Sequence, residues 1–89
     1  MNHHDLKIWP EHYRNVKAGT KTFEIRRNDR GYQKGDYVEL HYWPQWAADT
    51  ETLTRFVTDT NPILKFKIGD IYPIDAERVV FSLLPQEPK

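Results

Sequence analysis

The sequence contains no cysteine, which excludes disulfide bridges and zinc sites built from thiolates. It has no apolar run long enough for a membrane helix, and its N-terminus lacks the apolar core of a secretory signal peptide. It also lacks internal repeats and low-complexity segments. These absences favour a soluble protein of a reducing compartment, and we expect it to be cytoplasmic and to make no membrane contact.

The length of 89 residues suits one domain, residues 1–89, with a frayed tail from about residue 85. A domain of this size buries only a modest core. Aromatic residues make up 13% of the chain and supply much apolar area per residue. We therefore expect several of the aromatic side chains to lie in the core.

The formal net charge is zero, with 13 basic and 13 acidic residues, which argues against a bulk polyanion binder. The charge is unevenly distributed. Residues 21–34 carry five basic and two acidic side chains, whereas residues 45–61 carry one basic and three acidic ones. Either a binding site or an ordinary solvated face explains the basic segment.

The pattern along the chain predicts five strands and one helix. Residues 5–9 form a first strand with Leu6 and Ile8 on one side, and Pro10 then opens a short helix over residues 11–19. Gly19 suits the position after the helix, where a positive φ is common. Further strands are predicted over residues 21–27, 35–43, 63–74 and 77–84. Residues 63–74 form either a pair of strands or one strand that bends at Gly69.

The strand over residues 21–27 is unusual because charged residues alternate with apolar ones. Alternation places Phe23 and Ile25 on one face, which we expect to face the core, and Glu24 and Arg26 on the other. Lys21 then lies at the mouth of the strand. The opposite face carries either a cleft in which these side chains converge or a surface ladder of ion pairs.

Residues 44–62 are ambiguous. Asp49 is a suitable cap for a helix with Leu53 and Phe56 on one face, but the density of threonine equally suits a strand. The predicted fold is therefore of the α+β class and mostly β. We expect a small, curled antiparallel or mixed β-barrel with one or two short helices.

The first half of the chain carries an ordered set of motifs. A His and a Leu-Lys pair precede Pro-x-x-Tyr, Gly-x-Lys-x-x-Glu-x-Arg, Asn-Asp-Arg and Gly-Asp. The matching residues include His4, Lys7, Lys21, Glu24, Arg26 and Arg30. This pattern resembles the ASCH domain of the PUA-like superfamily, and within it a subgroup of small bacterial and phage proteins.

The resemblance implies a PUA-like barrel with a cleft that carries Lys21, Glu24 and Arg26 and binds RNA or a nucleotide. Some ASCH members are hydrolases, either acetylcytidine amidohydrolases or ribonucleases. In an enzyme of this kind, Lys21 and Glu24 would be the catalytic residues. The amidohydrolases carry a nucleophilic Thr three residues after the Lys, where this chain has Glu24.

Other ligand-binding candidates lie around this motif. His4 and Lys7 occupy motif positions, Arg30 is placed to reach a phosphate, and Trp46 is the tryptophan best placed to stack on a base. The four histidines show no metal-ligand spacing, so we predict no metal site and no cofactor.

Three hypotheses follow. The first is an RNA- or nucleotide-binding module, with Lys21, Arg26 and Arg30 on phosphate and Glu24 on a base or sugar. The second is a small hydrolase acting on a modified nucleoside or RNA. The third is an accessory protein-interaction domain, as phages encode, that uses residues 44–62 as its contact surface.

Overall fold

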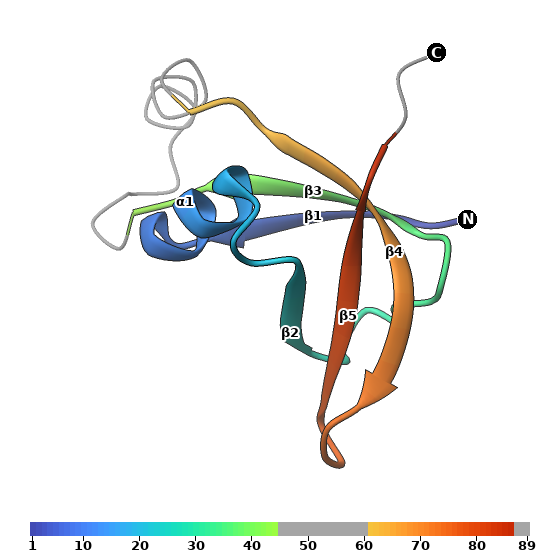
Figure 1. Ribbon diagram of the computed structural model, residues 1–89. Coiled ribbons are helices and arrows are strands. Elements are labelled where there is room, and N and C mark those ends of the chain that lie inside the picture. Colours follow the sequence, from blue (N-terminus) through green and yellow to red (C-terminus); the bar gives the residue numbers. More distant parts are fainter. Residues whose placement is uncertain (45–60, 87–89) are drawn as a thin grey trace.

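The computed structural model describes residues 1–44 and 61–86. Within these ranges the chain forms five strands and one helix (Figure 1). Their order is β1 (His3–Ile8), α1 (Pro10–Ala18), β2 (Phe23–Arg27), β3 (Tyr37–Tyr42), β4 (Leu64–Pro73) and β5 (Arg78–Pro85). These elements confirm the predicted number and order. The ambiguous stretch lies outside the described residues from position 45 to 60.

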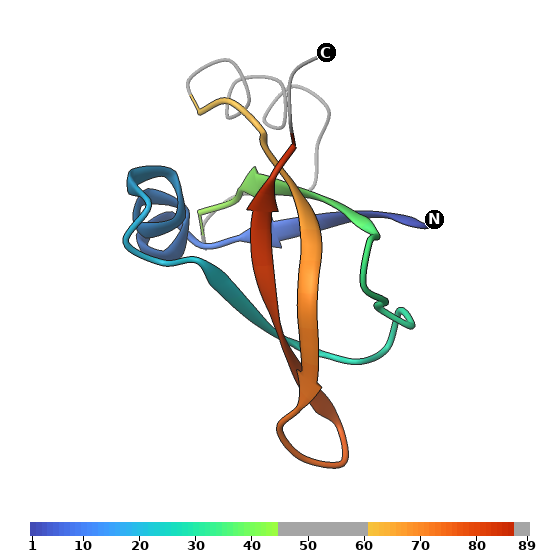
Figure 2. The ribbon, with the colours of Figure 1, turned by 45° about the vertical axis from the view of Figure 1, so that its right-hand side comes forward.

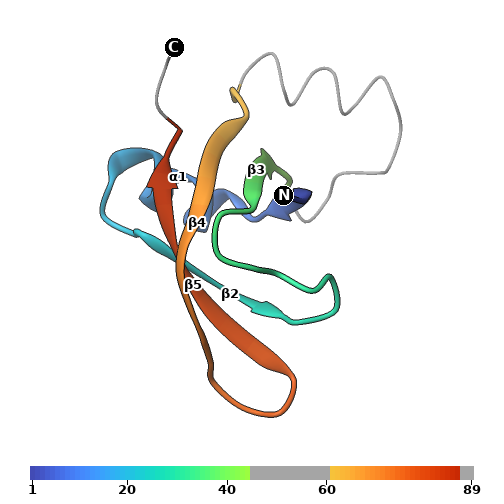
Figure 3. The same ribbon diagram turned by 90° about the vertical axis from the view of Figure 1, so that its right-hand side faces the viewer.

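The strands form one mixed sheet in the order β1-β3-β4-β5-β2. β1 and β3 are parallel, and the other three pairs are antiparallel. The sheet curls into a half-barrel: the β4–β5 hairpin crosses in front of β1 and β3 in Figure 2, and Figure 3 views β1 and β3 nearly end-on beside the long hairpin. The predicted fold class is confirmed.

Local sequence explains the helix that joins β1 to β2. Pro10 occupies its first turn, and Gly19 ends it with φ of 81°. Tyr13 and Val16 are its buried residues, three positions apart on one face. The Tyr13 hydroxyl donates a hydrogen bond to the Pro62 carbonyl, and its burial raises the pKa of this phenol.

In the part of the chain that the structure describes, no helix has the length and apolar character needed to cross a bilayer.

The core lies on the concave side of the sheet. Val38 and Leu40 of β3 are fully buried, Phe81 of β5 is 1% exposed, and Leu6 and Ile8 of β1 pack with them. β4 runs through an irregular register between Ile68 and Ile71, at the glycine predicted to bend it. β5 extends to Pro85, one residue beyond the predicted end of this strand.

The predicted orientation of β2 was wrong. Phe23 and Ile25 are 42% and 46% exposed, whereas Glu24 is only 3% exposed. The charged side of the strand therefore faces the concave interior, and the apolar side faces outward. This orientation is possible because cations on either side of Glu24 compensate its buried charge.

Candidate functional site

A cleft of about 290 Å³ opens where the end of β1, the start of α1 and strand β2 meet. Its lining combines basic, acidic and apolar side chains: Lys7, Ile8, Trp9, His12, Lys21, Glu24, Ile25 and Arg26. Four of the predicted site residues are in this set, namely Lys7, Lys21, Glu24 and Arg26. The Gly-x-Lys-x-x-Glu-x-Arg spacing thus predicted the grouping of Lys21, Glu24 and Arg26, although the apolar and charged faces of the strand are reversed.

Glu24 is the central acceptor of the cleft. Lys21 Nζ donates to one of its carboxylate oxygens over 3.2 Å, and Arg26 Nε donates to the other over 2.9 Å. The two basic side chains are 17% and 24% exposed, and that of Glu24 is 4% exposed. The acid therefore lies at the base of the cleft while both cations reach its opening.

The turn after α1 holds Lys21 in place. The Asn15 carbonyl accepts hydrogen bonds from the backbone N–H groups of Thr20 and Lys21, at 3.0 and 3.1 Å. Lys21 Nζ also lies 3.3 Å from Nδ1 of His12, which is on α1 about one helical turn before Asn15. His12, Lys21 and Glu24 thus form a continuous polar chain along the wall of the cleft.

Two arginines, Arg26 of β2 and Arg30 of the turn that follows it, bond to β1. β1 and β2 are the edge strands of the half-barrel. Arg26 donates to the Lys7 carbonyl and Arg30 to the Asp5 carbonyl, each over 3.1 Å. The guanidinium groups thus donate hydrogen bonds to backbone carbonyls at the edge of the sheet. In a closed barrel, a neighbouring strand would bond to these carbonyls. Arg30, predicted to reach a phosphate, has this structural contact and does not line the cleft.

The rim of the cleft carries an exposed tryptophan, Trp9, and a lysine, Lys7, that contacts the ring of a second tryptophan. Trp9 is 56% exposed although it is a large apolar side chain. Lys7 Nζ lies 4.5 Å from the centroid of the Trp43 ring, in cation–π geometry. Among the described residues that line the cleft, three are cationic and one is a carboxylate, so their summed charge is positive when the histidine is neutral.

His4, another predicted site residue, lies in the core and not at the cleft. It is 5% exposed, its ring is 4.7 Å from that of Tyr32, and its Nε2–H donates to the Asp36 carboxylate over 2.9 Å. Burial alone would raise the pKa of Asp36, but hydrogen bonds from His4 and from the backbone N–H groups of Asn2 and Gln33 outweigh it and lower this pKa. The pair ties β1 to the start of β3.

Trp46, the predicted stacking residue, lies outside the described residues, as do positions 45–60 of the predicted protein-contact segment. Sequence reasoning assigned no role in the cleft to Trp9 or His12. Their position in the sequence could have suggested this role. Trp9 precedes Pro10 and His12 follows it by two residues, where the chain turns from β1 into α1 beside Lys7.

Comparison with known proteins gives two findings. A family model described as "Domain of unknown function (DUF3850)" matches residues 3–75, which include every residue that lines the cleft. An uncharacterized 12.9 kDa protein in the GpA 3′ region of Escherichia phage P2 is 27% identical over 88 residues, an alignment that covers 89% of this chain and 81% of the relative.

Proposed function

Because the chain belongs to the DUF3850 family, whose name states no activity, we propose a function from the cleft itself: it binds RNA or a nucleotide as an ASCH-type, PUA-like module. The observation that carries this proposal is the buried Glu24 carboxylate held between Lys21 and Arg26 in the cleft. The order of Gly19, Lys21, Glu24 and Arg26 in the sequence supports the ASCH resemblance.

The charges of the cleft favour an anionic ligand. Among the described lining residues, Lys7, Lys21 and Arg26 carry three positive charges against the one negative charge of Glu24. The Lys21 ammonium has three donors, and its described hydrogen-bond partners are Glu24 and His12. It also lies 5.5 Å from the centroid of the Phe23 ring. A donor is therefore available for a phosphate or carbonyl oxygen of the ligand.

A nucleotide also suits the apolar part of the lining. Trp9 presents an exposed ring beside the cations, and a base stacked on such a ring gains about 1–3 kcal/mol. Each oxygen of Glu24 has a second lone pair and can accept a hydrogen bond from a base amine or a ribose hydroxyl. The cleft thus offers contacts for the phosphate, base and sugar of one nucleotide.

Titration of the full chain with short single-stranded RNA and with free nucleotides, followed by tryptophan fluorescence, tests the proposal. Lys7→Ala and Trp9→Ala alter the rim and leave the Lys21–Glu24–Arg26 group intact. Each should weaken binding roughly ten- to a hundredfold, the loss expected for one charged or stacking contact. Lys34→Ala is the control, since it removes an equal charge from an exposed ion pair with Asp70 outside the cleft.

Equal affinities of the three variants and the wild type would overturn the proposed site. Absence of any nucleic-acid or nucleotide binding at low salt would overturn the function. Protein binding through residues 44–62 would then become the leading hypothesis, and the contact segment could be tested by its deletion.

A hydrolase acting on a modified nucleoside or RNA is the second candidate. The contacts from His12 to Lys21 and from Lys21 to Glu24 favour it, because they provide a route for a proton along the cleft wall. Turnover of RNA or acetylated nucleosides that is lost in Lys21→Ala, with the circular dichroism unchanged, would support catalysis. Tight binding without turnover would leave the chain a binding module.

A further inference from the structure

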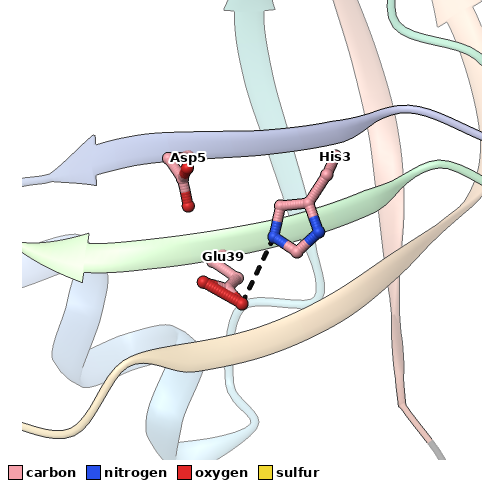
Figure 4. A group of neighbouring side chains, drawn as sticks. All are labelled: His3, Asp5 and Glu39. Carbon is pink, nitrogen blue, oxygen red and sulfur yellow. Dashed lines mark ion pairs between the residues drawn. The ribbon is translucent and has the colours of Figure 1, made fainter.

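The convex face of β1 and β3 carries a second cluster of polar side chains, outside the cleft. The two strands are parallel, and Asp5 of β1 lies directly opposite Glu39 of β3 in the register. His3 and His41 lie on the same face, each two residues from one of these acids. Figure 4 shows the side chains of His3, Asp5 and Glu39 projecting from the same side of the strand pair.

The donor atoms of this cluster are close together. His3 Nε2 is 3.3 Å from Oε2 of Glu39, and His41 Nε2 is 3.2 Å from Oδ1 of Asp5. One ligand atom from each of His3, Asp5 and Glu39 lies within 4.8 Å of the other two. Two ligands of a tetrahedral ion, each 2.0–2.1 Å from it, are about 3.3 Å apart, which is the spacing of His3 and Glu39.

A positive charge stabilises this pair of acids, and Lys65 of β4, the register partner of Glu39, already supplies part of it. Two carboxylates that face each other across a strand pair repel and destabilise the sheet. A histidine compensates an acid fully only when it is protonated, whereas a divalent ion does so with the imidazole neutral. An ion between the two strands would therefore turn an unfavourable pair into a stabilising one.

The chemistry of the donors selects the kind of ion. One imidazole nitrogen and two carboxylate oxygens suit zinc and similar divalent transition metals, whereas magnesium prefers oxygen ligands and retains its waters. His3 and Asp5 are exposed, so water can fill a fourth position. The ligands stand on paired strands, which hold them more rigidly than a loop would.

We propose that His3, Asp5 and Glu39 bind one divalent transition-metal ion of the zinc type on the convex face of the β1–β3 pair. His41 contacts Asp5 and orients it as an outer partner of the site. The site is separate from the cleft, although Lys7 follows Asp5 by two residues on β1, about 7 Å along the strand.

Calorimetric titration of the tag-free full chain with Zn²⁺ tests this inference, together with the visible absorption of Co²⁺ as a probe of tetrahedral geometry. One equivalent should bind. His3→Ala and Glu39→Gln should each weaken the affinity by more than the roughly ten- to hundredfold loss expected for an outer partner. Mg²⁺ in equal concentration should not compete.

His12→Ala and Glu77→Gln are the matched controls, because they change a histidine and an acid that lie outside the cluster. Both should bind Zn²⁺ as the wild type does. The inference is overturned if no equivalent of Zn²⁺ binds, if His3→Ala and Glu39→Gln bind as tightly as the controls, or if Mg²⁺ displaces the ion. In the first two cases the cluster is a set of surface ion pairs, and in the third it is a cation site that is not of the zinc type. RNA binding by the cleft is measured separately, so either proposal can fail alone.

Discussion

Glu24 of β2 is the register partner of Phe81 of β5, and both side chains face the interior of the half-barrel, at 3% and 1% exposure. A carboxylate thus lies beside one of the most deeply buried aromatic rings. The acid is stable there because Lys21 and Arg26 bond both of its oxygens. The same register sends Phe23 and Ile25 outward.

This orientation predicts that Glu24→Gln destabilises the chain more than Phe23→Ala does. The glutamine leaves two partly buried cations without a counter-charge, which should cost about 3 kcal/mol. Phe23 is 42% exposed, and its truncation should cost about 1 kcal/mol or less. Urea unfolding of both variants measures the difference, and a larger loss for Phe23→Ala would place the apolar side of β2 in the core.

Phe81→Ala should be among the most damaging single truncations in the chain. The ring is 1% exposed and lies 5.1 Å from that of Tyr32, so its loss leaves a cavity. We expect a cost of about 3–5 kcal/mol. Thermal unfolding of Phe81→Ala and of Phe23→Ala compares the same substitution at a buried and an exposed site. Similar melting temperatures of the two variants would contradict the described core.

The parts of the fold that were predicted correctly are those specified locally. Pro10 and Gly19 mark the ends of α1, and the alternation of Leu6 and Ile8 marks the buried face of β1. Alternation shows which residues share a face, but it does not show which face is inward. For β2 the hydrophobicity of Phe23 and Ile25 suggested the wrong choice, because the ion pairs that make burial of Glu24 possible depend on Lys21, which precedes the strand.

The candidate site was predicted in part for the same reason. Lys21, Glu24 and Arg26 are close in the sequence, so their grouping followed from spacing. The contacts of His4 with Asp36 and of His3 with Glu39 join residues more than thirty positions apart. They depend on the parallel pairing of β1 with β3, which no local pattern specifies.

Gly69→Ala should destabilise the chain because the bend of β4 brings it against β5. An added Cβ would lie 2.4 Å from Ser82 Oγ and 3.1 Å from Leu84 side-chain atoms. Overpacking of this kind costs about 1–3 kcal/mol. Ser82 Oγ also accepts a hydrogen bond from the Asp70 N–H, which the displaced hydroxyl would lose.

A double-mutant cycle with Ser82→Ala separates these effects. Ser82→Ala removes the closest clashing atom, so the double variant should lose less stability than the sum of the single losses. Strict additivity in urea unfolding would show that the strand relaxes around position 69 without contact to Ser82.

Acid should lower the free energy of unfolding, partly through the protonation of Asp36. The pKa of this carboxyl is lower in the folded state than in the unfolded state, where it is about 3.9. The unfolded state therefore binds the proton more tightly. Asp36 contributes its full stabilisation above about pH 5, and this is lost as the pH falls through 3.9 toward the lower folded value.

Asp36→Asn isolates this contribution. The variant should be less stable than the wild type at pH 7, and the difference in the free energy of unfolding should shrink as the pH falls toward 3. The exposed Asp75, whose pKa is also lowered, is present in both proteins and cancels in the comparison. A difference that stays constant with pH would assign the effect of Asp36 to packing and not to its charge.

The salt dependence of RNA binding should show which cations contact phosphate. For a single strand, the logarithm of the affinity falls with the logarithm of salt concentration by about 0.7 for each phosphate neutralised. If Lys7 contacts a phosphate at the rim, Lys7→Ala should lower this slope by about 0.7, whereas Trp9→Ala should weaken binding at every salt concentration and leave the slope unchanged. Lys34→Ala again serves as the charge-matched control. A slope that Lys7→Ala and Lys34→Ala reduce equally would mean that the strand follows the general charge of the surface and does not enter the cleft.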